Sequence, residues 1–367
     1  GQGLDTGVIG TINHHLRDKI WPTELTTPGS VELHGRLRDF ADHGAKALAI
    51  EVSSHALSQH RGEYIDFDAA IFTNLTRDHL DYHSTMDEYF AAKAKLFTGL
   101  LPRSKKSRKA AVINSDDSYG RQLAAIAKAP VVTFGQSQSD FKFEILSEDF
   151  SGSQIQYDFR GSRHAVKVKI PCRYNVYNAA GALACVLALG LDAAKARSDL
   201  ESFMGVKGRL ERVVHGRKFH VFVDYAHTDD ALTNVLDSLG AIRAKQAQKS
   251  RIITVFGCGG DRDKGKRPLM AQAAVRGSDF VVITSDNPRT EDPDKIIQDI
   301  VAGVPKTALG KTVLTETLRR DAIETALEIA QDGDVVLIAG KGHEDYQIIG
   351  KQKYPFSDVE IVREILS

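Results

Sequence analysis

The sequence predicts an α/β fold whose second half is a doubly wound parallel sheet. The first observation is a strand, a glycine-rich turn, a helix and a second strand within residues 251–289, which together make a βαβ unit. The second is that four successive predicted strands from Phe219 onward each end in a polar cluster. In a doubly wound sheet the carboxyl ends of the strands share one edge, where ligands bind. The sequence therefore predicts a ligand site along that edge.

Composition limits the class of protein. The chain has 367 residues, enough for two domains, and its 42% hydrophobic and 26% charged residues are ordinary for a soluble globular protein. A formal net charge of zero argues against a broad basic face for nucleic acid. The three cysteines are far apart in the sequence and indicate neither a disulfide framework nor a zinc site.

These features favour a protein of the reducing cytoplasm. No apolar run reaches the roughly 18 residues of a membrane span, so neither a membrane nor nucleic acid is expected as a partner, and we expect a monomer. The chain starts without an initiator Met and without a signal segment, which indicates the interior of a longer chain.

The first half of the chain predicts alternating strands and helices. Strands are expected at 47–52, 69–74, 110–114 and 131–135, and helices at 31–43, 86–100 and 179–189. Alternating apolar residues over 141–170 indicate an antiparallel β insertion. Asn175 and Asn178 flank the start of the last helix, where side-chain capping is the default role.

Polar residues follow two of these strands. Glu51 ends the first, and His79 belongs to the Asp/His-rich segment 74–83 that follows the second. Because we expect the two strands to be adjacent, a carboxylate, an imidazole and water could form a Mg²⁺ or Mn²⁺ site. Hydrogen-bonded strand ends explain the same residues equally well, and a buried Glu51 would need such a partner.

Two further features leave alternatives open. The Thr/Pro/Gly-rich segment 22–29 indicates a loop whose hydroxyls either bind a ligand or cap the next helix, and capping is favoured for these residues alone. Lys93 lies on the same helix face as Leu96 and Phe97. Its amine either extends to solvent or is neutralised by a modification, and the residues do not decide between the two.

The second half places charged clusters at strand ends. Arg262 follows the strand 252–256, and Arg289 follows the strand 280–284, so both guanidinium groups could hold one carboxylate in a shared crevice. A charge run is more often a solvated loop, but two glycine-flanked clusters at successive strand ends favour a binding site. Further strands are predicted at 219–223 and 334–339, and helices at 230–242, 293–301 and 321–330.

Several long motifs in this order resemble those of the Mur ligase family, over nearly the whole chain. The resemblance is closest to the UDP-N-acetylmuramoyl-tripeptide synthetases, and it rests on the motifs at 51–55, 72–83, 91–93, 224–227, 256–263, 286–289 and 340–344. It implies an incomplete central ATPase-type α/β domain at 1–207. A C-terminal Rossmann-like, doubly wound domain at 208–367 would then bind an amino acid.

The resemblance also implies an ATP-dependent ligase of peptidoglycan synthesis. ATP would phosphorylate the terminal carboxylate of UDP-N-acetylmuramoyl-L-alanyl-D-glutamate, and an amino acid would attack the acyl phosphate. The family pattern assigns Thr26, Thr27, Ser53, Gln59 and Arg61 to the muramoyl substrate, and Glu51, His79 and a carbamylated Lys93 to Mg²⁺ and catalysis. It assigns Asn178, Arg209, Asp224 and His227 to ATP, and Arg262, Asp286, Asn287, Pro288, Arg289, Gly340 and Glu344 to the amino acid.

Charge favours meso-diaminopimelate over L-lysine as that amino acid. Its second carboxylate needs a cation and its second amine needs an anion, which Arg289 and Glu344 supply. Lysine lacks the distal carboxylate and would leave Arg289 unpaired. A site built to bind a group discriminates strongly against a substrate that lacks it.

Departures from the family pattern keep other hypotheses open. The sequence has no Gly-x-Gly-Lys-Thr/Ser phosphate loop, because its one Gly-Lys-Thr run, at 310–312, has Ala308 in place of the first glycine. It also has no uridine-binding N-terminal domain, so we expect this chain to be inactive alone. Asp229 replaces a proline, which is expected to loosen the next helix start, and Leu25 replaces an Asn that contacts substrate. The alternatives are a catalytically silent binding module that keeps the muramoyl and amino-acid pockets, an L-lysine-adding ligase, and a ligase resembling folylpolyglutamate synthase.

Overall fold

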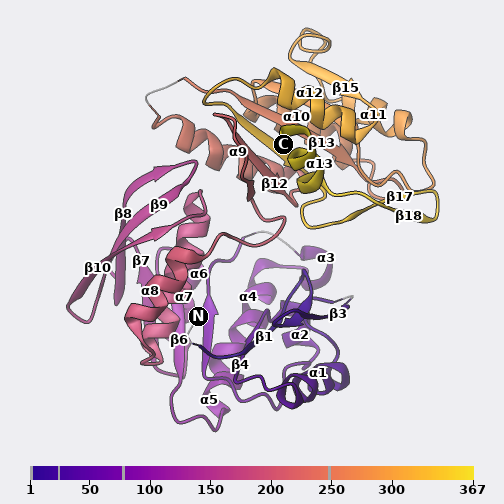
Figure 1. The fold of residues 1–367 in the computed structure, drawn as a ribbon. Helices are drawn as coiled ribbons and strands as arrows, with labels where there is room; N and C mark the ends of the chain where they lie inside the picture. Colours follow the sequence, from indigo (N-terminus) through magenta and orange to yellow (C-terminus); the bar gives the residue numbers. More distant parts are fainter. Residues whose placement is uncertain (1–2, 24, 77–78, 247–248) are drawn as a thin grey trace. The chain divides into compact units, whose positions relative to one another are not determined.

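The computed structural model describes residues 3–23, 25–76, 79–246 and 249–367, and it divides into two compact units (Figure 1). Unit 1 comprises Gly1–Ser147, Gln154–Val168 and Tyr174–Phe203, and unit 2 comprises Glu148–Ser153, Lys169–Arg173 and Met204–Ser367. Both units combine helices with parallel strands, so the predicted α/β class is confirmed. Across the described residues, no helix is both long and apolar enough to cross a membrane.

Among its described residues, unit 1 contains ten strands in two sheets. They are β1 (Thr6–Ile9), β2 (His14–Leu16), β3 (Lys19–Trp21), β4 (Ala47–Ile50), β5 (Ala69–Phe72), β6 (Ala110–Asn114), β7 (Val131–Gly135), β8 (Phe141–Asp149), β9 (Gly152–Phe159) and β10 (Ser162–Val168). The four-stranded sheet has the order β3-β2-β1-β4, and the six-stranded sheet has the order β10-β9-β8-β7-β6-β5. Because β4 and β5 are edge strands of different sheets, the expectation that they are adjacent is wrong.

The helices of unit 1 correct two expectations. The predicted helix 86–100 is α-helical only to Lys95 and continues as a π-helical turn, and the predicted helix 179–189 begins earlier, at Arg173. The helices are α1 (Ser30–Asp42), α2 (Ser54–Ser58), α3 (Leu80–His83), α4 (Met86–Lys95), α5 (Leu101–Arg103), α6 (Ser118–Ile126), α7 (Arg173–Ala188) and α8 (Ala193–Ser202), with a π-helical turn η1 (Leu96–Leu100) after α4. Helix α7 begins before Asn175 and Asn178, which therefore lie inside it and do not cap it. The reason is that Val176 and Ala180, one turn apart, are both fully buried and extend its apolar face.

Unit 2 is built on a six-stranded sheet with the order β11-β12-β16-β13-β14-β15. Its strands are β11 (Glu211–Val213), β12 (His220–Asp224), β13 (Ile252–Cys258), β14 (Phe280–Ser285), β15 (Val313–Glu316) and β16 (Val335–Ala339), and a separate hairpin joins β17 (Tyr346–Ile349) to β18 (Gln352–Pro355). Its helices are α9 (Asp229–Arg243), α10 (Lys266–Gly277), α11 (Pro293–Val301), α12 (Arg319–Ile329) and α13 (Asp358–Leu366).

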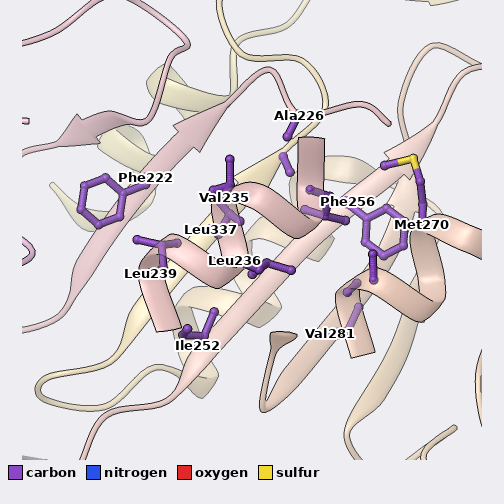
Figure 2. Close-up of a cluster of buried hydrophobic side chains, with 14 of the residues drawn as sticks. Phe222, Ala226, Val235, Leu236, Leu239, Ile252, Phe256, Met270, Val281 and Leu337 are labelled. Atoms are coloured by element: carbon purple, nitrogen blue, oxygen red, sulfur yellow. The ribbon is translucent and has the colours of Figure 1, made fainter. Parts of the chain in front are cut away.

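Both faces of this sheet are buried. Val336 and Ile338 of β16 belong to one hydrophobic cluster with α12 and α13, whereas Leu337 between them belongs to a second cluster with α9 and α10. Figure 2 shows the second cluster, in which Val235 and Leu239 of α9 lie with strand residues. Successive side chains of a strand point to opposite faces, so near-continuous apolar strands are what a sheet covered on both sides requires.

The topology of unit 2 brings polar strand ends together. Strands β12, β16, β13 and β14 are consecutive neighbours in the sheet and all run parallel. These are the four strands for which the sequence predicted a polar cluster at the carboxyl end, and the clusters do share one edge.

The N-terminus of α9 carries two stabilising features where the sequence suggested a looser start. The Thr228 hydroxyl caps the helix by accepting from the N–H of Ala231, and Asp229 places an acid in the first turn.

Candidate functional site

Three loops at this edge have backbones that only close packing explains. Asp261 follows β13 with φ 53°, and Arg289 follows β14 with φ 50°, which are left-handed conformations that side chains rarely adopt. Gly340 follows β16 with φ 117°, and a Cβ there would lie 2.7 Å from Oδ2 of Asp286. Such conformations cost about 1–3 kcal/mol each at residues with side chains, so they persist only where the surroundings fix them.

The two predicted arginines meet at the backbone of Gly259. A Cβ at this glycine would lie 2.8 Å from Nη1 of Arg289 and 3.7 Å from Cγ of Arg262. Arg289 is half-buried and donates from Nη1 to the carbonyl oxygen of Gly260 at 2.7 Å. Arg262 is exposed, and its Nη1 donates to the carbonyl oxygen of Asp261 at 3.2 Å. The structure thus brings both cations to one short stretch of the edge.

A buried arginine fixes the loop that carries Arg262. Arg267 lies in the first turn of α10 with no exposed surface, and it donates to both carboxylate oxygens of Glu291 at 3.1 and 2.9 Å. The hydrogen bond from Arg267, followed by those from the N–H of Asp261 and from Lys264, lowers the pKa of Glu291 to about 2. The charged run is therefore not a wholly solvated loop, because Arg267 is part of the protein interior.

An acid–amide cluster lies at the ends of β14 and β16. Asn287 is buried and donates from Nδ2 to Oε2 of Glu344 at 2.9 Å. The ammonium of Lys341 donates to Oδ1 of Asn287 and to Oε2 of Glu344, both at 3.1 Å, and lies 3.7 Å from Oδ1 of Asp286. Sequence reasoning assigned three of these residues to the amino acid and missed Lys341. Its place two residues after the buried strand β16 was the available signal.

The unpredicted hairpin β17–β18 holds the same segment from the other side. The N–H of Ile348 donates to Oδ1 of Asn287 at 2.9 Å, and Nε2 of Gln347 donates to the carbonyl oxygen of Asp286 at 2.6 Å. The N–H of Arg289 donates to the carbonyl oxygen of Ile348 at 3.0 Å. Pro288, which is also buried, is thereby enclosed in a segment fixed on both flanks.

Three of the four residues assigned to ATP form a second group in unit 2. Asp224 is buried and accepts from the N–H of Leu210 at 2.6 Å and from the N–H of Ala226 at 2.8 Å. Burial raises the pKa of Asp224, although those two hydrogen bonds oppose the rise. The Arg209 guanidinium lies 5.2 Å from the centre of the Tyr225 ring. Nδ1 of His227 lies 2.9 Å from the carbonyl oxygen of Tyr225.

The fourth of these residues lies in the other unit. Asn178 is in α7, next to Tyr177, whose hydroxyl donates to Oδ2 of Asp116 at 2.6 Å. Asp116 also accepts from the N–H groups of Gln136 and Ser137 at 2.7 and 3.1 Å. Unit 1 thus fixes the helix turn that carries Asn178.

In unit 1, Thr27 organises the residues assigned to the muramoyl substrate. Its hydroxyl donates to the carbonyl oxygen of Glu51 at 2.7 Å and accepts from the N–H of Ser53 at 3.0 Å. Arg61 donates from Nη1 to the carbonyl oxygen of Thr27 at 2.8 Å and from Nε to Oε1 of Gln59 at 2.9 Å. Four of the five assigned residues are thus linked in one hydrogen-bonded group.

The hydroxyls of the 22–29 segment do not cap the next helix. The N-cap of α1 is Gly29, with no side-chain hydrogen bond, so the favoured capping interpretation is wrong. The reason is that Thr27 is committed to the end of β4, and the hydroxyl of Thr26 lies 3.0 Å from that of Thr11. Thr11, which sequence reasoning missed as a site residue, connects Thr26 to Glu51.

The residues assigned to metal contact different partners within unit 1. Glu51 is exposed, and its Oε2 accepts from the N–H and hydroxyl of Thr11 at 3.2 and 2.7 Å. His79 and Lys93 both lie against Tyr89, with a ring distance of 5.8 Å and an Nζ-to-ring distance of 5.1 Å. Among the residues that the structure describes, which do not include Asp78, no three His, Cys, Asp or Glu side chains are grouped so that they could hold a metal ion.

An aromatic and imidazole cluster surrounds His79 and was not predicted. His55 lies 4.9 Å from His79 between ring centres, and His83 stacks on Tyr89 at 5.1 Å. His83 is buried, its Nε2 lies 2.8 Å from the hydroxyl of Ser54, and burial followed by the charges of His55 and His79 lowers its pKa. Tyr89 contacts both His83 and His79, with ring centres 5.1 and 5.8 Å apart, and so links the two histidines.

Two family models match the chain and define its class. The model described as Mur ligase middle domain matches residues 2–186, and the model described as Mur ligase, glutamate ligase domain, matches residues 208–342. Together they cover most of both units. The chain therefore belongs to the Mur ligase family of enzymes.

Within this family, the most similar relatives share one name. The chain is 44% identical over 364 residues to the UDP-N-acetylmuramoyl-L-alanyl-D-glutamate–2,6-diaminopimelate ligase of Aquifex aeolicus, covering 99% of this chain and 72% of that protein. It is 46% identical over 378 residues to the ligase of the same name from Geobacter metallireducens, covering 98% and 72%. A solved structure of a ligase with this name matches with a TM-score of 0.72 and 36% identity, over 100% of this chain and 73% of that one.

Proposed function

We propose that this chain supplies the substrate-binding units of an ATP-dependent ligase. The ligase adds meso-diaminopimelate to UDP-N-acetylmuramoyl-L-alanyl-D-glutamate in peptidoglycan synthesis, in the cytoplasm and as a monomer. The observation that carries the proposal is the pairing of opposite charges at the edge of the unit 2 sheet. Within the described residues, Nε and Nη2 of Arg289 and Oε1 of Glu344 have no hydrogen-bond partner. One cation and one anion are therefore available to an amino acid.

These charges match the distal end of diaminopimelate. Its second carboxylate pairs with the two unused nitrogens of Arg289, and its second ammonium pairs with Oε1 of Glu344. L-lysine carries the ammonium and not the carboxylate, so it would leave Nε and Nη2 of Arg289 desolvated without a partner. The names of the relatives, which all specify 2,6-diaminopimelate, support the same choice.

The chemistry follows in two steps. The γ-phosphoryl group of ATP passes to the terminal carboxylate of the D-glutamyl residue, and ADP leaves. The amine of diaminopimelate then attacks the acyl carbon, the C–N bond forms, and phosphate leaves with the bonding electron pair. In unit 2, Arg209, Asp224 and His227 bind ATP, and in unit 1 Asn178 is assigned to the same ligand. Thr26 and the group around Thr27, Ser53, Gln59 and Arg61 orient the muramoyl substrate.

The donor chemistry of unit 1 fits Mg²⁺ as the implied metal. Within the described chain, Oε1 of Glu51 accepts no hydrogen bond, while Thr11 fixes the other oxygen and so orients the carboxylate. His79 adds an imidazole, and carbamylation of Lys93 would convert a cation into an anionic oxygen donor. When bound, the ion neutralises charge on the transferring phosphoryl group.

A binding module without catalysis is the second candidate. The observation that favours it is that the only Gly-Lys-Thr/Ser run in the 367 residues, Gly310–Thr312, is not a phosphate loop, because Ala308 stands where Gly-x-Gly-Lys-Thr/Ser needs a glycine and β15, not a helix, follows it. The backbone N–H groups and Lys of such a loop are the main cradle of the β- and γ-phosphates, so we expect this chain to be inactive alone.

The test is phosphate release from ATP in the presence of UDP-N-acetylmuramoyl-L-alanyl-D-glutamate. Meso-diaminopimelate and L-lysine are assayed in parallel, on this chain and on a version extended upstream in its gene. The proposal is supported if the extended version releases phosphate with meso-diaminopimelate and not with L-lysine. Turnover by neither version with any amino acid overturns it and favours the binding module, and a preference for L-lysine overturns the substrate assignment.

A further inference from the structure

Lys341 is a buried charge to which the proposed chemistry gives no role. Its side chain has no exposed surface, and it lies between the ends of β14 and β16. Its ammonium contacts Asn287 and Glu344 at 3.1 Å and Asp286 at 3.7 Å. A buried ammonium is costly unless charged and polar partners compensate it, so this arrangement requires all three residues to stay in place.

The hydrogen bonds of Lys341 determine how Asn287 is oriented. An ammonium and a backbone N–H can only donate, and both the ammonium of Lys341 and the N–H of Ile348 face the same amide atom of Asn287. That atom must be the oxygen, so the amide nitrogen faces Glu344, to which it donates at 2.9 Å. A neutral apolar side chain at position 341 would remove one of the two donors that enforce this orientation.

The same contacts divide the two oxygens of Glu344 into different tasks. Oε2 accepts from Lys341 and from Asn287, so it is committed to the protein. Oε1 has no partner among the residues that the structure describes and remains available. Lys341 also offsets one of the two carboxylate charges of Asp286 and Glu344, which leaves a single net negative charge beside the cation of Arg289.

We propose that Lys341 is a positioning residue that sets the amino-acid selectivity of this pocket. It acts by fixing Asn287 and by presenting one oxygen of Glu344 to the distal ammonium of the amino acid. The inference rests on the proposed function and extends it, because it names the residue that makes the pocket match a distal group with one positive and one negative charge. Without Lys341, Glu344 turns toward Asn287 or toward solvent, and the pocket gains a second uncompensated negative charge.

The experiment uses the ligase extended upstream, with Lys341→Met as the principal variant and Lys351→Met as the control. Lys351 is exposed at the turn between β17 and β18, so its removal tests for a general effect of losing a lysine near the site. Values of KM and kcat are measured for meso-diaminopimelate, ATP and the muramoyl dipeptide, together with the preference for diaminopimelate over L-lysine.

We expect Lys341→Met to raise KM for diaminopimelate by about 10- to 100-fold, the range for losing hydrogen bonds to charged groups, and to narrow the preference over lysine. KM values for ATP and the muramoyl dipeptide should stay unchanged, which a merely structural defect would not allow. Lys351→Met should leave all three unchanged. Loss of affinity for all three substrates together, or an unchanged KM for diaminopimelate, overturns the inference.

A double variant separates positioning from folding. If Lys341 acts through Glu344, Lys341→Met should have a much smaller effect on KM in a Glu344→Gln background, and additive effects would overturn the inference. Lys341→Gln, which keeps a donor at this position, replaces Lys341→Met if circular dichroism shows that variant unfolded. Failure of the unmodified ligase to use diaminopimelate would instead overturn the proposed function itself.

Discussion

The guanidinium of Arg289 is hydrogen-bonded at 2.7 Å to the carbonyl oxygen of Gly260, which joins the loop after β14 to the loop after β13. The bond uses only Nη1. The backbone of Arg289 is also held, at φ 50°, by hydrogen bonds of its N–H to Ile348 and of its carbonyl to Gly350. The cation that we propose binds the amino acid is therefore held by the protein without substrate, which reduces the cost of ordering it.

Replacing Arg289 with alanine should erode the preference for diaminopimelate. The variant loses the partner of the distal carboxylate, so the ratio of kcat/KM for diaminopimelate to that for L-lysine should fall by about tenfold or more. The measurement is phosphate release with each amino acid. Arg276→Ala, which removes an exposed arginine of α10, is the control. Unchanged selectivity in Arg289→Ala would contradict the assignment.

The buried ion pair between Arg319 and Asp358 should dominate the stability of unit 2 near α12 and α13. Both side chains have no exposed surface, and two hydrogen bonds of 2.8 and 2.7 Å join them. Asp358→Asn leaves a buried cation without its counter-charge and should lower the free energy of unfolding by about 3–5 kcal/mol. Urea unfolding measures the loss.

A matched control lies on the same two helices. Arg320 and Glu364 form an ion pair whose side chains are 46% and 65% exposed. Glu364→Gln should therefore change the free energy of unfolding by only about 0–1 kcal/mol. Equal losses in Asp358→Asn and Glu364→Gln would show that burial does not set the strength of these pairs.

Glu291 should make the stability of unit 2 depend on acid pH. Its pKa is lowered from 4.5 to about 2, first by Arg267, so the folded state favours the ionised form. The stabilisation is fully present above pH 4.5 and is lost as the pH falls toward about 2. Urea unfolding curves across this window should show a smaller slope of unfolding free energy against pH for Glu291→Gln. Parallel curves for the two proteins would contradict this origin of the pKa.

Lys93→Ala should reduce the activity of the extended ligase, and added bicarbonate should not restore it. The variant has no amine to carbamylate, so it cannot supply the anionic oxygens that the metal assignment needs. Lys95→Ala, two residues further along and exposed, is the control. Phosphate release measures both. A fully active Lys93→Ala variant would contradict the assignment of Lys93 to the metal site.

Strands that are long, apolar and buried on both faces were predictable. β14 and β16 fall within a residue or two of their predicted ranges, because hydrophobicity alone marks them and charged clusters end them. The hairpin β17–β18 was not, because its residues are half-buried or exposed and show no alternation. The three short strands before residue 22 are also too brief to carry a pattern.

The candidate site was predictable in its residue types and less so in its connections. Motif order gave Asn287, Arg289 and Glu344, and charge logic gave a role to the last two. The role of Lys341 was not predicted, because it depends on burial and on contacts with Asp286 and Asn287, more than 50 residues away, as well as on Glu344, and a linear sequence shows neither burial nor distant contacts. The expected neighbourhood of β4 and β5 failed for a similar reason, because the order of strands within a sheet is a long-range property.

The attachment of the hairpin β17–β18 to residues 286–289 has a consequence for protein engineering. A transplant of the 286–289 segment alone into a related ligase would carry its side chains and leave behind the main-chain groups of Ile348 and Gly350 that shape it. The smallest exchangeable cassette is therefore discontinuous and joins 286–291 to 340–355. Libraries that diversify only 286–291 in a related ligase would vary side chains on a segment that lacks the hydrogen bonds from Ile348 and Gly350.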